Sequence, residues 1–332
     1  MPGQIGWGII GCGKVTELKS GPAFSKVEGS SLVAVMRRDA SLAADYAARH
    51  GVKEWYDDST ELIANPRVNA VYVATPPGSH MKYAIESIRA GKPVYIEKPM
   101  ALNHMECDAI LKEARKYNVP VFVAYYRRAL PAFLKVKELI HSGAIGKALT
   151  VNVEFFKTYD DPEGEATPWR LKPEISGGGH FVDLASHLLD YLDFVFGPVN
   201  VVNSLVLNQA QKFKAEDMVM ANLLLGGSIP CSLTYCFSAG KSAAKDTIEI
   251  SGEKGRISFS CFNYAPVEIV TGDGHIIIPN EKPDHVQQYL IDTVVKELRG
   301  KGICNSTGES AARTNKVMDE ILKDYYSSAT NH

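Results

Sequence analysis

Two short stretches of this chain hold residue types that could move protons. Lys98 lies in "EKPM" (97–100), directly after an apolar run, and Asp183 and His187 lie four residues apart in "GGGHFVDLASHLLD" (177–190). Positions four apart share one helical face, so the carboxylate and the imidazole would lie together. An ammonium can bind a substrate oxygen, and an imidazole can exchange a hydroxyl proton. A structural alternative stays open at this point: a surface lysine, and a surface helix with a satisfied histidine.

A third stretch, "IGWGIIGCGKV" (5–15), could bind phosphate. Its apolar run leads into Gly8, Gly11 and Gly13, and glycine loops of this kind hold phosphate on backbone N–H groups. The third glycine of the dinucleotide fingerprint would fall at Thr16, so spacing alone leaves a simple strand end equally open. Its position after a strand and before a helix favours the phosphate loop.

Composition narrows the function classes. The 332 residues carry 36 Lys and Arg against 38 Asp and Glu, without a long run of one sign. This balance argues against a nucleic acid or an anionic membrane surface as partner, and no apolar stretch reaches the length of a membrane span. The N-terminus does not predict a secretory signal. Six cysteines without a CxxC pair predict neither disulfides nor a metal site, and they fit a cytoplasmic protein.

The first part of the chain alternates between strand and helix patterns. Apolar runs predict buried parallel strands at 5–10, 31–36, 70–75, 93–97 and 120–125. Amphipathic stretches predict helices at 41–51, 79–91 and 103–118, with Ser79 and Asn103 as N-caps and Gly91 as a stop. This alternation predicts an α/β fold with a doubly wound parallel sheet, a dinucleotide-binding Rossmann domain, over residues 1–125.

The rest of the chain, residues 126–332, predicts an α+β domain for substrate binding and oligomerisation. Closely spaced strands, typical of a large, mostly antiparallel open sheet, are expected at 148–157, 200–209, 218–225, 228–238, 246–252 and 255–260. Helices are expected at 180–196, 285–301 and 309–328, and the last is a candidate to pack back on the first domain. A free sheet face could cover a partner subunit, which predicts a homodimer or homotetramer.

The residues after the second strand bear on the choice of cofactor. An acid at this place binds the ribose 2′-hydroxyl of NAD, whereas an arginine accommodates the 2′-phosphate of NADP. Here Arg37 occupies the expected position, with Arg38 beside it. Asp39 could serve the ribose if the strand ended later, and the pair could also form an ordinary charged turn. We favour NADP over NAD.

Four motifs together carry a family resemblance. They are "GIIGCGKV" (8–15), "VATPPGSH" (73–80), "EKPM" (97–100) and "WRLKPEISGGGHFVDLASHLLD" (169–190). In order and spacing, the chain resembles the Gfo/Idh/MocA oxidoreductases, the glucose–fructose oxidoreductase and inositol dehydrogenase family. The resemblance implies an NAD(P)-dependent oxidoreductase that transfers a hydride between nicotinamide and a sugar, cyclitol or related polyol. Thr16 and Arg37 depart from the family pattern, and Arg37 bears on cofactor choice.

The resemblance also assigns roles. It implies Lys98, Asp183 and His187 as the catalytic set. The implied cofactor contacts are Gly8, Gly11, Cys12, Gly13, Lys14, Val15, Arg37, Arg38, Thr75, Pro76, Pro77, His80, Glu97 and Lys98. Besides Asp183 and His187, the implied substrate contacts are Tyr126, Arg127, Trp169 and Arg170. Glu97 is expected to be a structural partner rather than a second catalyst, and His180 has no role that the resemblance assigns.

Two other functions stay open beside the dehydrogenase. A relative of this kind can use bound cofactor transiently and cleave a glycoside without net redox change. A non-catalytic dinucleotide or sugar sensor is the other alternative, against which the presence of Lys98, Asp183 and His187 argues.

Overall fold

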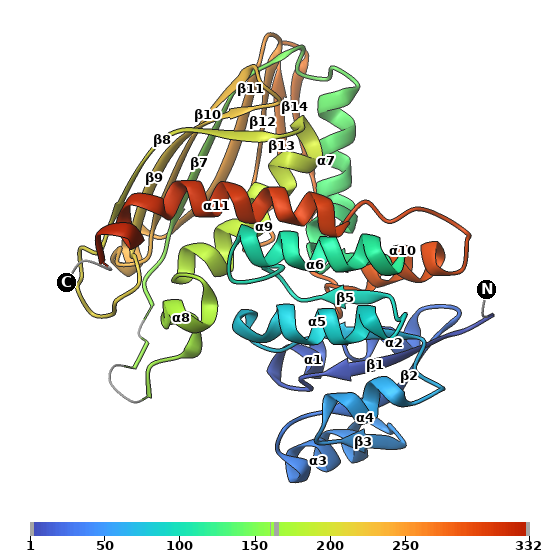
Figure 1. Cartoon of the computed structure of the whole chain (residues 1–332). Coiled ribbons are helices and arrows are strands. Elements are labelled where there is room, and N and C mark those ends of the chain that lie inside the picture. Colours follow the sequence, from blue (N-terminus) through green and yellow to red (C-terminus); the bar gives the residue numbers. More distant parts are fainter. Residues whose placement is uncertain (1–2, 160, 163–165, 330–332) are drawn as a thin grey trace. The chain divides into compact units, whose positions relative to one another are not determined.

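The computed structural model describes residues 3–159, 161–162 and 166–329 (Figure 1). The chain divides into two compact units, Met1–Leu130 with Pro283–Ala312, and Pro131–Lys282 with Arg313–His332. The predicted boundary after residue 125 therefore lies inside the first unit. The stretch Pro283–Ala312, which we assigned to the second domain, groups with the first unit and includes the first turn of the last helix.

The first unit is built on a parallel sheet of six strands in its described part. Its order is β3-β2-β1-β4-β5-β6, and every neighbouring pair is parallel. The strands are β1 (Ile5–Ile10), β2 (Ser30–Met36), β3 (Glu54–Tyr56), β4 (Ala70–Val73), β5 (Val94–Ile96) and β6 (Val121–Val123). The predicted doubly wound sheet is confirmed. The edge strand β3 was missed because three partly exposed residues give no apolar run.

Helices cover both faces of this sheet. They are α1 (Lys14–Leu18), α2 (Ala23–Lys26), α3 (Ala40–His50), α4 (Ser59–Ala64), α5 (His80–Arg89), α6 (His104–Tyr117) and α10 (Gln288–Leu298). Alternate residues of β1, β2, β4, β5 and β6 enter two separate cores. In β4, for example, Val71 belongs to the core that includes residues of α4, α5 and α6, whereas Tyr72 packs with Phe24 of α2. Burial on both faces explains why the strands are almost wholly apolar.

The second unit is built on a sheet of eight strands in its described part. Its order is β14-β13-β12-β11-β7-β10-β9-β8, and only the β7–β10 pair is parallel. The strands are β7 (Ala148–Phe156), β8 (Val199–Leu207), β9 (Met218–Leu225), β10 (Ile229–Cys236), β11 (Lys245–Gly252), β12 (Gly255–Phe259), β13 (Val267–Thr271) and β14 (Gly274–Ile278). The predicted mostly antiparallel sheet is confirmed; β13 and β14 were not predicted.

Helices α7 (Pro131–His141), α8 (Pro173–Ser176), α9 (His180–Phe196) and most of α11 (Gly308–Ala329) complete the second unit. Helix α9 packs on β8 and β9. The hydroxyl of its Tyr191 donates a 2.7 Å hydrogen bond to the Phe133 carbonyl of α7, and the two rings meet edge to face. Arg313 of α11 forms an ion pair with Asp193 of α9 at 2.7 Å. These contacts fix α9, which carries the candidate acid–base residues. No helix in the described part of the chain is long and apolar enough to cross a membrane.

Candidate active site

The glycine loop after β1 lies where the strand order of the first sheet reverses, between β1 and β4. Such a reversal opens a crevice at the carboxyl ends of parallel strands. Gly11 has φ +94°, and its N–H donates to the Met36 carbonyl at 2.8 Å. A Cβ there would lie 2.7 Å from Cγ2 of Thr75. Only glycine lets the loop pass this close to the segment after β4.

Gly13 stands directly before α1, and a Cβ there would meet only the Gly11 carbonyl oxygen, at 3.8 Å. The helix begins without a side-chain cap, so the start of the loop and helix fits a phosphate held by backbone N–H groups. Lys14 is exposed and Val15 half-buried beside it. The Cys12 thiol is buried, which raises its pKa to about 11, so only the backbone of Cys12 suits a cofactor contact. The Thr16 hydroxyl donates to the Gly13 carbonyl at 2.8 Å, so threonine ties the loop to α1.

Gly8 does not lie in this loop. It is a buried residue of β1, and a Cβ there would come within 2.6 Å of Leu62 and 2.9 Å of Val68. The glycine is needed for packing between β1 and the α4 region. We therefore correct its predicted role from cofactor contact to core packing.

Asp39 is engaged in helix capping. Strand β2 ends at Met36, and the Asp39 carboxylate accepts hydrogen bonds from the Leu42 N–H at 3.1 Å and the Ser41 hydroxyl at 2.6 Å. These two bonds lower the pKa of Asp39. Arg37 is half-buried and Arg38 exposed, and neither forms an ion pair with a described residue. Arg37 thus follows the end of the second strand of the sheet, and the nearby Asp39 caps α3.

The segment after β4 holds Thr75, Pro76 and Pro77, of which the first two are half-buried. Ser79 precedes α5, but its hydroxyl donates to Thr75 Oγ1 at 2.8 Å instead of capping the helix. His80 is fully buried. Its Nε2 lies 2.6 Å from the Thr75 carbonyl oxygen and its Nδ1 lies 3.0 Å from that of Pro99. His80 thus connects two loops rather than offering its ring to a cofactor, and burial lowers its pKa.

Glu97 and Lys98 follow β5 at the same edge of the sheet. Glu97 is buried and accepts hydrogen bonds from the Tyr72 hydroxyl, from Gln287 at 2.5 Å and from the Lys98 N–H at 3.2 Å. These contacts support the structural role expected for Glu97. Lys98 is half-buried, and a cis peptide bond joins it to Pro99.

Tyr126 and Arg127 lie in a short 3-10 helix, η2 (Tyr126–Ala129). Arg127 is buried, with its guanidinium carbon 5.0 Å from the centre of the Tyr126 ring. Neighbouring Arg128 donates to the Asn305 carbonyl at 2.9 Å. Arg128 thus fixes η2 to the segment before α11. Of the three side chains, only that of Tyr126 is partly exposed.

The second unit brings four predicted residues together around α9. Asp183 and His187 share one helical face, and Asp183 lies 3.3 Å from the Arg170 guanidinium. The Arg170 guanidinium stacks 4.4 Å above the Trp169 ring. His187 is buried beside the Phe262 ring, at 6.2 Å between centroids. An acid, a base, an arginine fork and an aromatic plate thus form one cluster, which suits a ligand rich in hydroxyl groups.

Glu216, which we did not predict, fixes the start of α9. Glu216 is 2% exposed, and its carboxylate accepts the Gly179 N–H on both oxygens, at 2.9 and 3.1 Å, and the Tyr326 hydroxyl at 2.5 Å. A Cβ on Gly179 would lie 2.8 Å from Ala215. Gly179 therefore admits the end of the β8–β9 connection, not a ligand. Burial raises the pKa of Glu216. In the sequence, the only indication of this role for Glu216 was its place as an acidic residue just before the apolar strand β9.

His180, whose role the sequence left open, pairs with Asp161 at 2.7 Å and stacks on the Tyr159 ring at 3.9 Å. Among the described residues, no group of three or more His, Cys, Asp or Glu side chains could hold a metal ion.

Comparison with known proteins assigns both units. Residues 5–125 match the model of the oxidoreductase family with an NAD-binding Rossmann fold, and residues 133–258 match the GFO/IDH/MocA C-terminal domain. The chain belongs to the Gfo/Idh/MocA family. The predicted family and the NAD(P)-dependent oxidoreductase activity are thereby confirmed.

Relatives span the whole length of this family member. Oxidoreductase P35 of Formosa agariphila is 41% identical over 96% of this chain and 98% of its own length. A 1,5-anhydro-D-fructose reductase of Ensifer adhaerens is 27% identical over 91% of both chains. The structure of an aldose-aldose oxidoreductase from Caulobacter crescentus, complexed with glycerol, has a TM-score of 0.85 at 23% identity and covers 98% of both chains. At this identity the structure shows a shared fold.

Proposed function

We propose that this oxidoreductase prefers NADP and transfers a hydride between the nicotinamide and a hydroxyl-bearing carbon of a sugar, cyclitol or related polyol. The observation that carries the substrate class is the α9 cluster, where Asp183 pairs with an arginine stacked on Trp169 beside His187. The name of the 1,5-anhydro-D-fructose reductase supports the same class.

When bound, the nicotinamide supplies or accepts the hydride. The backbone from Gly11 to Val15 would hold the pyrophosphate, with Thr75 and Pro76 beside the loop. Arg37, with Arg38, would hold the 2′-phosphate, whereas Asp39 caps α3. Guanidinium groups would give a phosphate dianion charge-assisted hydrogen bonds that a ribose hydroxyl does not offer.

Residues of the protein bind the reacting oxygen and transfer its proton. The Lys98 ammonium binds the reacting oxygen and stabilises negative charge on it. His187 takes the hydroxyl proton during oxidation and returns it during reduction. Asp183 orients the substrate or the imidazole, and Arg170 holds Asp183 in place. Tyr126 completes the proposed substrate contacts, and the buried Arg127 supports its ring.

A turnover assay tests this function. The full chain is incubated with NADP or NADPH and a panel of sugars, cyclitols and their keto forms while nicotinamide absorbance is followed. We expect a substrate-dependent absorbance change that Asp183→Asn reduces. Absence of any change across the panel, with cofactor bound, contradicts the proposal. Substrate conversion at constant absorbance would favour redox-neutral glycoside cleavage.

We also propose that the enzyme works in the cytoplasm as a homodimer or homotetramer formed through the second sheet. All six cysteines are free thiols, which suits a reducing compartment. Val202, Leu205 and Leu207 of β8 and Met220 of β9 are exposed, and a second copy would cover them. Light scattering should give a mass of two or four chains, and Leu205→Glu should reduce it. A monomer at micromolar concentration would contradict this proposal.

A further inference from the structure

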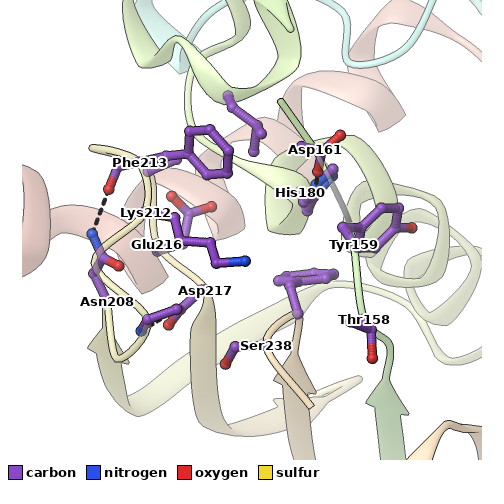
Figure 2. Close-up of a pocket in the computed structure, with 14 residues that line it drawn as sticks. Thr158, Tyr159, Asp161, His180, Asn208, Lys212, Phe213, Glu216, Asp217 and Ser238 are labelled. Carbon is purple, nitrogen blue, oxygen red and sulfur yellow. Dashed lines mark hydrogen bonds and ion pairs between the residues drawn. The ribbon is translucent and has the colours of Figure 1, made fainter. Parts of the chain in front are cut away.

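A pocket in the second unit has no role in the proposed chemistry. It has a volume of about 120 Å³ and lies between the end of β7, the start of α9, the β8–β9 connection and the end of β10 (Figure 2). Neither Asp183 nor His187 lines it. His180, Lys212, Phe213 and Phe237 do.

One wall of the pocket is aromatic and rigid. His180 stacks on Tyr159 at 3.9 Å, and the Phe237 ring lies 5.5 Å from His180. His180 is also held by Asp161 at 2.7 Å. His180 and Phe237 are each less than a tenth exposed. These rings present a fixed apolar surface with a paired imidazole at its edge, which suits the C–H face of a ring that carries hydroxyl groups.

The opposite wall is polar and reaches into the pocket. Asp217 accepts the Gln209 and Ala210 N–H groups, each at 2.7 Å, and Asn208 donates to the Phe213 carbonyl at 2.6 Å, so the loop is well held. Figure 2 shows Lys212 extending from this loop toward the middle of the pocket. Lys212 forms no ion pair or hydrogen bond with any residue that the structure describes. Its ammonium is thus available to donate to oxygen atoms of a ligand.

The pocket continues the face of α9 that carries the candidate acid–base pair. His180, Asp183 and His187 are spaced i, i+3 and i+7, so they lie along one side of the helix. From His180 to His187 the helix rises about 10 Å, which suits two linked sugar rings. Tyr159 lines the pocket, and burial together with the nearby Asp183 carboxylate raises the pKa of its phenol.

We propose that this pocket binds a second sugar ring of the substrate, so that the enzyme acts on a disaccharide or larger glycoside rather than on a single free ring. This inference rests on the proposed function, since one ring must react beside Asp183 and His187. The second ring lies against Phe213 and the aromatic wall that includes His180, and Lys212 donates to its hydroxyl oxygens.

Matched ligand pairs and loop variants test the pocket. The full chain, with and without NADP, is titrated calorimetrically with glucose and cellobiose, glucose and maltose, and galactose and lactose. We expect at least one disaccharide to bind about tenfold more tightly than its monosaccharide. Lys212→Ala and Phe213→Ala should remove this preference without changing monosaccharide binding. Lys214→Ala should keep the preference, because Lys214 is an exposed residue of the same loop that does not line the pocket.

The outcomes separate the two proposals. If no pair shows a preference for the longer sugar, or if Lys212→Ala and Phe213→Ala leave the preference intact, the pocket inference is overturned. A preference that both variants remove, in a protein that turns over no sugar with either cofactor, upholds the pocket and contradicts the proposed function. Turnover of monosaccharides without any preference for the longer sugar upholds the proposed function and overturns the pocket inference.

Discussion

Among single residues, Lys98 decides whether the proposed proton chemistry is right. It follows β5 at the carboxyl edge of the parallel sheet, and its neighbour Glu97 is already used by Tyr72 and Gln287. Lys98→Met keeps much of the side-chain volume and removes the charge. We expect near-native folding and cofactor binding, with turnover lowered by at least about a hundredfold.

The measurement is steady-state turnover together with fluorescence titration of the cofactor. Lys82→Met, on the exposed face of α5, is the matched control and should keep wild-type turnover. Near wild-type turnover in Lys98→Met would show that the charge on Lys98 has no part in the chemistry.

Arg37 is the single residue that we expect to decide between NADP and NAD. Charge-assisted bonds to a 2′-phosphate predict that NADPH binds about tenfold to a hundredfold more tightly than NADH. Replacing Arg37 and Arg38 with serine should remove that difference. Asp39→Asn should not, because asparagine also caps helices. Titration by fluorescence gives the affinities of the three proteins for both cofactors; wild-type binding of NADH as tight as NADPH would refute the assignment.

The position of Asp39 shows what residue types alone could not decide. In the sequence, two arginines and an acid follow β2, and either an arginine or the acid could have faced a ribose. The predicted end of the strand at Met36 is confirmed, but only the geometry shows that Asp39 accepts the Leu42 N–H. Gly8 is similar, because a glycine in a motif and a glycine in a packed strand look alike in sequence.

At the scale of elements, the orientation of α9 depends on Glu216. Its carboxylate binds the Gly179 N–H and the Tyr326 hydroxyl in a buried place. Glu216→Ala leaves both donors unsatisfied and should lower the free energy of unfolding by about 1–3 kcal/mol. Because α9 carries Asp183 and His187, kcat should fall as well. Glu216→Gln keeps one acceptor oxygen, so its free energy of unfolding and its kcat should fall less than those of Glu216→Ala.

Chemical denaturation and turnover measure the two effects. Glu268→Ala is the control, since that carboxylate forms an exposed pair with His275 and should change stability by less than about 0.5 kcal/mol. If Glu216→Ala keeps wild-type stability and kcat, the carboxylate does not fix α9.

The two loops of the first unit are connected by His80, which predicts a pH dependence. Burial lowers the pKa of His80 in the folded chain below its unfolded value of about 6.5. As pH falls through this value, the unfolded chain gains a proton that the folded chain does not. Stability should therefore fall as pH is lowered from about 6.5 toward the folded pKa.

Denaturation at about pH 7.5 and about pH 5.5 measures this loss in the wild type and in His80→Gln. The variant should lose less stability than the wild type on acidification, because it lacks the titrating ring. His275→Gln, at an exposed histidine, should keep the wild-type difference. An unchanged pH dependence in His80→Gln would mean that His80 titrates alike in both states.

For the whole molecule, the periodicity of apolar residues predicted most of the strands and helices, but few of the contacts between elements distant in sequence. Long apolar strands and well-capped helices such as α6, where Asn103 accepts the Glu106 N–H, are visible in sequence because their signals are local. The short strand β3 and the helix α7 carry weaker local patterns. The return of Pro283–Ala312 to the first unit depends on contacts distant in sequence, such as Gln287 with Glu97.

The same limit applied to the candidate site. The motifs located Lys98, Asp183 and His187, and the structure added Arg170 at 3.3 Å from Asp183 as a physical partner. Glu216 could not be predicted, because its partner Gly179 lies 37 residues away along the chain. Residue types indicate chemistry, whereas the groups that hold them in place are found only in three dimensions.

Net hydride transfer between nicotinamide and a substrate carbon distinguishes the proposed oxidoreductase from a redox-neutral enzyme. It can be followed with an isotope: C4-deuterated NADPH, labelled on the transferred face, is incubated with the keto substrate found in the panel, and the product is analysed by mass spectrometry. We predict one deuterium in each product molecule, with an equal amount of cofactor oxidised. Product that forms without deuterium and without loss of NADPH would refute hydride transfer.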